Sequence, residues 1–165
     1  MKRIITCITL IALIAIVCCF AVPSPVCSQE PPEATLERLL NQSGYTIVKK
    51  TNKVWTIDFN STKSPPFRVI ISVGSTPAPD IVVFVTVIQK KDFTASVESM
   101  YKLLKLTYEL DKVKVMFDRD DDISVRIDSM LRITDLQALK EIIGQVARSS
   151  ETIYVEMMPF LKTAR

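Results

Sequence analysis

One segment constrains the fold of this 165-residue chain more than any other, the run 81–89, which reads IVVFVTVIQ. β-Branched and aromatic residues dominate this run, and these residue types favour strands. It shows no alternation of polar and apolar residues, and such a strand is typically covered on both faces. We therefore predict that it forms the central strand of an antiparallel sheet, with helices packed on at least one face.

The residues before this run predict one short helix and three strands. Prolines and acids at 30–33 are typical of a helix start, and Gly44 is a natural end for that helix. Three polar residues at 51–53 predict a tight hairpin turn between the first two strands. We expect the three strands at 45–50, 54–59 and 67–73.

The residues after the run predict a second helix and a second hairpin. The helix is expected at about 95–110, and its apolar residues recur at helical spacing. Two alternating segments, 112–117 and 123–130, predict the strands of the hairpin, and 118–122 predicts its polar turn. The apolar stripe of the second helix consists of Val97, Met100, Tyr101, Leu104 and Tyr108, and Leu103 and Leu106 widen it.

A long helix is expected to close the chain. Thr134 and Gln137 have the spacing of a capping box, and Pro159 should kink or end the helix. Its apolar residues step by three and four, which is typical of a helical seam. The simplest interpretation lays this seam on the sheet, and a homodimer contact is the alternative. The seam consists of Leu136, Leu139, Ile143, Val146, Ser150, Ile153, Met157 and Phe160.

Together these patterns predict the α+β class, with one largely antiparallel sheet of about six strands and helices before, within and after it. The expected organisation is a leader at 1–28, a spacer at 29–33 and a single domain at 34–163. A chain of this length can bury a core of useful size in one domain.

The leader predicts the compartment. Lys2 and Arg3 precede an uncharged segment, 4–22, and small residues before position 29 fit a signal-peptidase site. This predicts a signal peptide and a periplasmic or secreted domain. The alternative is a retained inner-membrane anchor, since the segment is longer than the roughly 15 residues of a signal-peptide core and within the roughly 17 to 25 that span a bilayer. Both interpretations place the domain outside the cytoplasm.

Cleavage of the leader would change the charge and the cysteine content. It would remove two of the 21 basic residues and none of the 18 acidic ones, so the remaining domain would be close to neutral. Such a charge argues against a nucleic-acid partner and against an electrostatic membrane surface. All four cysteines lie within the leader, so the domain would have no disulfide and would depend on its core.

The sequence lacks the residues that most common catalytic mechanisms require. It contains no histidine, so together with the confinement of cysteine to the leader this excludes the usual triads, cysteine nucleophiles and zinc sites from the domain. We therefore predict no catalytic residues, no cofactor and no enzymatic activity. The best metal candidate is the acidic segment 118–122, which begins like a calcium loop but has Ile123 where such a loop needs glycine and Ser129 where it needs glutamate. A solvated hairpin turn is the expected role of this segment.

Two stretches carry a resemblance to known families. The segment LLKLTYELDKVKVMFDRDDDISVRIDSML, followed by DLQALKEIIGQVARSSETIYVEMMPFL, resembles the YbjN-type family of bacterial sensory-transduction regulators. The order of helix, strands, helix, hairpin and long helix also resembles the type III secretion chaperone-like fold. The first resemblance implies no enzymatic activity, and the second implies a surface that binds a partner polypeptide, commonly in a dimer. The leader and the near-neutral charge depart from secretion chaperones, which are usually acidic and cytosolic.

The resulting functional prediction is an exported, non-enzymatic protein-binding or regulatory module. Its expected partner is another protein or a second copy, with a homodimer through the C-terminal helix as one form. No nucleic-acid partner is expected, and membrane contact is expected only through 4–22 if that segment is retained. The alternative prediction is a membrane-tethered envelope or stress factor that keeps this anchor.

Overall fold

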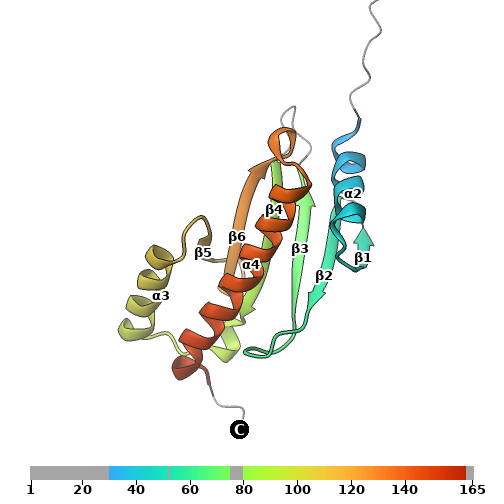
Figure 1. Cartoon of the computed structure of the whole chain (residues 1–165). Helices are drawn as coiled ribbons and strands as arrows, with labels where there is room; N and C mark the ends of the chain where they lie inside the picture. The colour runs from blue at the N-terminus through green and yellow to red at the C-terminus, as the bar shows by residue number, and fades with distance from the viewer. Residues whose placement is uncertain (1–29, 52, 75–79, 163–165) are drawn as a thin grey trace, which may run out of the picture. The chain divides into compact units, whose positions relative to one another are not determined.

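Six strands form one sheet in the order β1-β2-β3-β4-β6-β5, and each pair of neighbours is antiparallel (Figure 1). The computed structural model describes residues 30–51, 53–74 and 80–162, and the predicted leader at 1–28 lies outside them. The strands are β1 (Ile47–Thr51), β2 (Val54–Phe59), β3 (Phe67–Val73), β4 (Asp80–Ile88), β5 (Lys114–Phe117) and β6 (Ile123–Met130). The run at 81–89 therefore forms an interior strand, as predicted.

Three α-helices accompany the sheet in the described residues, one before it, one between β4 and β5, and one after it. They are α2 (Pro32–Ser43), α3 (Val97–Glu109) and α4 (Leu136–Met157), with single 3-10 turns at Lys90–Asp92, Leu131–Ile133 and Met158–Phe160. The α+β class and the arrangement of helices before, within and after the sheet are confirmed. No helix in the described part of the chain is long and apolar enough to cross a membrane.

Helix ends follow the local sequence signals. Gly44 adopts a left-handed conformation with φ of +83°, which glycine tolerates better than other residues, and α2 ends there. Helix α4 ends just before Pro159, which lies in the following 3-10 turn. The predicted capping box of α4 is wrong by one residue, because Asp135 is the N-cap and its carboxylate accepts from the Ala138 N–H. Thr134 instead donates to the Met130 carbonyl.

The hydrophobic core lies between the sheet and the helices on one of its faces. Helix α4 crosses β3, β4 and β6, while α2 packs beside α4 and against β3 (Figure 1). The seam of α4 is buried there, with Ile143 and Ile153 fully inaccessible to solvent. The prediction that this seam lies on the sheet is confirmed, and a homodimer cannot use the same side chains while the domain is folded.

The opposite face of the sheet carries no helix among the described residues, which corrects the prediction that the central strand is covered on both faces. Burial alternates along β4, so Ile81, Val83 and Val85 are buried while Val82 and Phe84 are half-exposed. The register explains the alternation, because Val83 pairs with Ile71 and Ile127, which are also buried. The lack of alternation between polar and apolar residues in the run therefore reflects apolar residues, such as Val82 and Phe84, on the open face as well.

Candidate protein interaction surface

Helix α3 is held against the edge of the domain at three levels. At its N-terminal side, Phe93 and Leu161 form an isolated antiparallel bridge, and the Lys162 N–H donates to the Asp92 carbonyl at 2.8 Å. In its middle, Lys102 forms an ion pair with Glu156 of α4. Beyond its C-terminal end, the Gln145 side-chain amide donates to the Asp111 carbonyl at 2.6 Å. These contacts fix which side of α3 faces the domain.

The side of α3 that faces the domain contains only three buried residues. Ser99 and Leu103 are buried, together with Leu106, at steps of four and three residues. Ser99 also closes the N-terminal end of the helix, since it exchanges hydrogen bonds with Ser96 in a capping box. These residues pack towards α4 and β5, the two main elements that α3 contacts.

The outward side of α3 carries an apolar stripe that is exposed to solvent. Its members step by four, three and four residues, so they lie on one side of the helix, opposite Ser99 and Leu103. We call these four residues the α3 stripe, and they are Val97 (90% exposed), Tyr101 (66%), Leu104 (69%) and Tyr108 (92%). The sequence pattern places these four residues in one stripe with Met100, Leu103 and Leu106. In the structure Leu103 and Leu106 are buried in the core and Met100 is half-buried against it, whereas the four residues of the α3 stripe face solvent.

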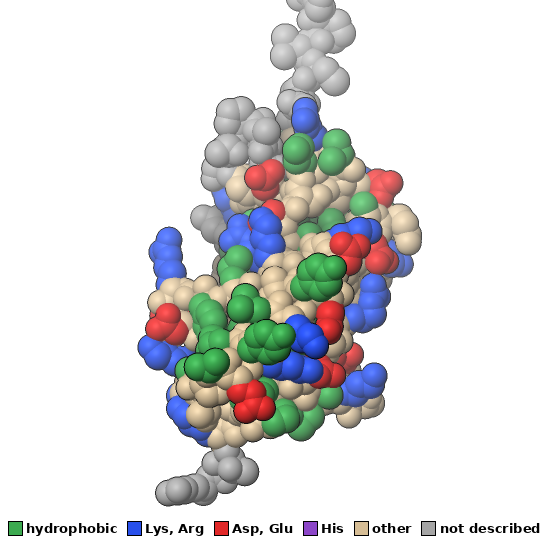
Figure 2. Space-filling view, turned by 90° about the vertical axis from the view of Figure 1, so that its left-hand side faces the viewer, with side chains coloured by type: hydrophobic (Ala, Val, Ile, Leu, Met, Phe, Trp, Pro, Cys, Tyr) green, Lys and Arg blue, Asp and Glu red, His purple; other side chains and the backbone are tan. Residues whose placement is uncertain are grey.

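Figure 2 views the molecule from the side on which α3 lies in Figure 1. Hydrophobic side chains gather in the lower half of this face, with charged side chains around them. A shallow hollow beside the N-terminal half of α3 is lined by Ala95, Ser96, Val97, Met100, Tyr101 and Leu104. Isolated apolar side chains are normal on a protein surface, but a contiguous group with two tyrosines is typical of an interaction site.

The sequence contained a signal for this surface. Leu103, Leu106 and Leu110 already provide one apolar line at steps of three and four. Two apolar lines on opposite sides of one helix can both be buried only if other elements pack against both sides. A helix at the edge of a domain receives cover on one side only, so one of the two lines must face solvent.

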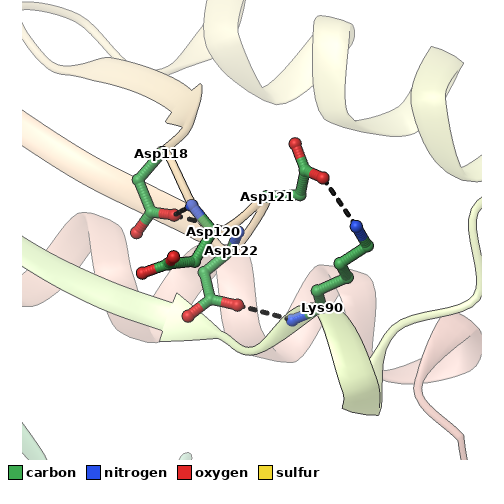
Figure 3. A network of polar contacts seen from close by, with 5 residues as sticks. All are labelled: Lys90, Asp118, Asp120, Asp121 and Asp122. Carbon is green, nitrogen blue, oxygen red and sulfur yellow. Dashed lines mark hydrogen bonds and ion pairs between the residues drawn. The ribbon is translucent and has the colours of Figure 1, made fainter.

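The acidic segment 118–122 forms the hairpin turn between β5 and β6 (Figure 3). Asp118 Oδ1 accepts from the backbone N–H groups of Asp120 and Asp122, and Asp118 Oδ2 accepts from the Ser124 hydroxyl. Asp118 therefore stabilises the turn with its carboxylate, as aspartate commonly does.

Two other acids of this turn, Asp121 and Asp122, contact Lys90, which lies in the 3-10 turn after β4. Asp121 forms an ion pair with the Lys90 ammonium at 2.6 Å, and Asp122 Oδ1 accepts from the Lys90 N–H at 2.7 Å (Figure 3). The hydrogen bond from Lys90 to Asp121 raises the pKa of Lys90 above its ordinary value. Among the described residues, no group of three potential ligands is arranged to hold a metal ion.

The open face of the sheet carries a second charged group beside its half-exposed apolar residues. Asp128 of β6 contacts Lys114 of β5 and Arg126 of its own strand, each at 2.7 Å. Burial opposes the ionisation of Asp128, but the hydrogen bonds and charges of Lys114 and Arg126 outweigh it and lower the pKa of this carboxyl. The arrangement connects β5 and β6 through charged side chains at the edge of the sheet.

Comparison with known proteins gives matches among solved structures. No protein-family model matches the chain, including any for the YbjN type, and no curated protein matches it. Among solved structures, the chain is similar to a chain of the heterodimeric ExoU–SpcU complex from the type III secretion system of Pseudomonas aeruginosa. The identity is 14%, the TM-score is 0.48, and the likeness covers 78% of this chain and 99% of that chain.

Proposed function

We propose that this chain is an exported, non-enzymatic protein-binding module that contacts its partner through the α3 stripe. The observation that carries the proposal is the exposure of Val97, Tyr101, Leu104 and Tyr108 on one side of a helix that is anchored at three levels. Tyrosine is enriched at protein interfaces because it buries a large area with few rotatable bonds. A rigid helix also loses little conformational entropy on binding.

The spacing of the stripe indicates the chemistry of the partner. Steps of four, three and four residues match the apolar seam of a helix that packs along another helix. On one side of the stripe lie Glu98 and Lys105, both exposed and seven positions apart, and on the other lie Met100 and Thr107. The proposed partner element is therefore an amphipathic helix with an apolar seam and opposite charges along one flank.

A second copy of α3 meets this description when the two helices run antiparallel. A two-fold axis near the middle of the stripe brings Glu98 of one copy towards Lys105 of the partner subunit, and the reverse. The same symmetry brings Tyr101 towards Leu104 of the partner subunit and Val97 towards Tyr108 of the partner subunit. A parallel arrangement would place each charge opposite an uncharged flank. Self-association through α3 is thus the second candidate, in place of the C-terminal helix.

The test is site-specific photocrosslinking of the full chain in the cells that produce it. A photoreactive amino acid replaces Tyr101, and a matched control carries it at Lys140, an exposed position on the outer side of α4. We expect a discrete adduct only from position 101, and its loss when Leu104→Ser is added. An adduct of twice the chain mass indicates a second copy, and another mass indicates a different protein. Equal adduct yields from positions 101 and 140 would overturn the proposal.

Export is the part of this proposal that depends on the sequence alone. It is supported by Lys2 and Arg3 before the uncharged segment 4–22, and by small residues before position 29. The alternative is a membrane-tethered envelope or stress factor that retains 4–22. Intact mass spectrometry of the native protein distinguishes the two, since a mass that begins at Gln29 removes the anchored alternative and a full-length mass removes the cleaved one.

A further inference from the structure

Two stretches of the chain match the acceptor motif for asparagine-linked glycans, which is Asn-x-Ser/Thr with x other than proline. One is Asn41-Gln42-Ser43, and the other is Asn60-Ser61-Thr62. A motif this short also arises by chance, so its presence alone assigns nothing. The structure distinguishes the two stretches, because they differ in backbone conformation and in the surroundings of the hydroxyl group.

The first motif is part of the C-terminal end of α2. Asn41 lies in the last turn, and Ser43 is the final residue of the helix. The Ser43 hydroxyl donates to the Leu40 carbonyl at 2.6 Å and accepts from the Tyr45 N–H at 3.2 Å. Ser43 is also buried, with 5% of its surface exposed. An enzyme could bind this motif only if the end of α2 unwound.

The second motif lies in the loop that connects β2 to β3 at one end of the sheet (Figure 1). The loop, 60–66, belongs to no helix or strand, and both Asn60 and Thr62 are exposed. Within the described part of the chain, neither of these two side chains has a hydrogen-bond partner. The amide and the hydroxyl of this motif are therefore accessible without any unfolding.

A local turn shapes this loop without using either group. The Ser61 hydroxyl accepts from the Lys63 N–H at 3.0 Å and from the Ser64 N–H at 3.1 Å, which is the pattern of a serine turn. The loop starts and ends at the last pair of the β2–β3 ladder, Phe59 and Phe67, whose ring centroids are 5.8 Å apart. Binding of the motif by an enzyme would therefore leave the sheet and the core in place.

The residue two positions before the asparagine also differs between the motifs. Asp58 has this place before Asn60, and Leu39 has it before Asn41. Bacterial oligosaccharyltransferases require an acid at this place, so only the second motif meets their requirement. Asp58 accepts from the Arg68 Nε at 2.7 Å, but both side chains are about half exposed, so this ion pair costs little to release.

We propose that Asn60 is a glycosylation site, whose side-chain amide receives an oligosaccharide from a lipid-linked pyrophosphate donor. The inference rests on the placement of the domain outside the cytoplasm, which the exported form and the anchored form proposed above share. It does not depend on the α3 stripe.

The reaction at Asn60 is a group transfer. Its Nδ2 atom forms a bond to the anomeric carbon of the first sugar, while the bond between that carbon and the pyrophosphate oxygen breaks. The lipid pyrophosphate leaves with the electron pair, and the proton displaced from Nδ2 passes to solvent. The enzyme recognises the hydroxyl two residues after the asparagine, so the exposed Thr62 suits the reaction and the buried Ser43 does not.

The test is incubation of the purified full chain with a single-subunit oligosaccharyltransferase that requires only Asn-x-Ser/Thr, together with its lipid-linked oligosaccharide. Both motifs qualify by sequence for this enzyme, so the fold decides which one is used. Intact mass spectrometry should show one glycan on the native chain and none on Asn60→Gln. No glycan on the native chain, or a glycan that persists in Asn60→Gln, would overturn the proposal.

Matched variants at exposed positions separate the motif from unrelated effects, and none of them should unfold the domain. Thr62→Ala should abolish the glycan, whereas Thr62→Ser should keep it because the hydroxyl remains. Asn41→Gln is the control at the other motif and should leave the glycan unchanged. A glycan on Thr62→Ala, or its loss in Asn41→Gln, would contradict the assignment to Asn60. Failure of this assay overturns the glycosylation site alone, since the N-terminal mass of the native protein tests export separately.

Discussion

Helices α3 and α4 carry apolar stripes with the same spacing, but the two stripes meet different surroundings. Helix α4 crosses the interior strands, so Ile143 and Ile153 are fully buried. Helix α3 lies beside the edge strand β5 (Figure 1), and the sheet does not extend far enough to cover its second side. Periodicity therefore reveals that a helix has an apolar side, whereas its place relative to the sheet decides whether that side is core or surface.

The largest expected effect on stability comes from placing a charge in the buried seam of α4. Ile153→Asp should destabilise the domain by at least about 4 kcal/mol, because it leaves an unpaired carboxylate in the core. Circular dichroism during chemical denaturation measures this. Thr152→Asp, at the exposed neighbouring position, is the control and should remain folded. A soluble, folded Ile153→Asp protein would break the comparison, since it would mean that the α4 stripe is a contact surface.

Two adjacent leucines on α3, one buried and one exposed, allow the same substitution to be compared on the two sides of the helix. Leu103→Ala should cost about 2 to 4 kcal/mol of unfolding free energy, because only 6% of this side chain is exposed. Leu104→Ala should stay within about 0.5 kcal/mol of the native protein, because its side chain faces solvent. Denaturant titration of both proteins tests this difference. Equal losses would mean that α3 is rotated relative to the structure described above.

Release of one anchor of α3 should have a smaller and local effect. Gln145→Ala removes the hydrogen bond to the Asp111 carbonyl, which contributes about 1 kcal/mol. Hydrogen exchange should become faster in the last turn of α3 and stay unchanged in α4. Faster exchange along the whole of α4 would contradict the assignment of α3 as an appended edge helix.

The smallest expected effect is a change in the stability of the domain at low pH, and it does not involve the apolar residues of α3 or α4. The folded-state pKa of Asp128 is lowered, so its contribution to stability is present above the ordinary pKa of about 3.9 and is lost as the pH falls through the lower folded value. Because this carboxyl is partly exposed, the contribution should be less than about 1 kcal/mol. Asp128→Asn should reduce the loss of stability between about pH 4 and pH 2. Thermal melts across this range measure the difference, and an unchanged acid dependence would contradict it.

Much of the fold could be predicted because its determinants are local. Alternating residues identify β2, β3 and β6 within a residue of their observed bounds, and Gly44 and Pro159 mark the ends of two helices. The acidic turn at 118–122 follows from its composition alone. Each of these signals depends on neighbours along the chain, so tertiary structure does not alter it.

The candidate sites could not be predicted because they depend on long-range placement. The exposure of Tyr101 and Tyr108 follows from the position of α3 beyond the edge of the sheet, which no local pattern specifies. The half-exposed Val82 and Phe84 follow from a face that no helix in the described residues covers.

Hydroxyl-radical footprinting of the full chain tests the central claim most directly, because one experiment reports on both stripes. The chain is labelled once as dilute purified protein and once in native extract of the cells that produce it. We predict that Tyr101 and Tyr108 react rapidly in the dilute protein and lose reactivity in the extract, while the buried Met157 is protected in both. Equal reactivity of the two tyrosines in both samples, or protection of Tyr101 in the dilute protein, would contradict the assignment of the α3 stripe as a docking surface.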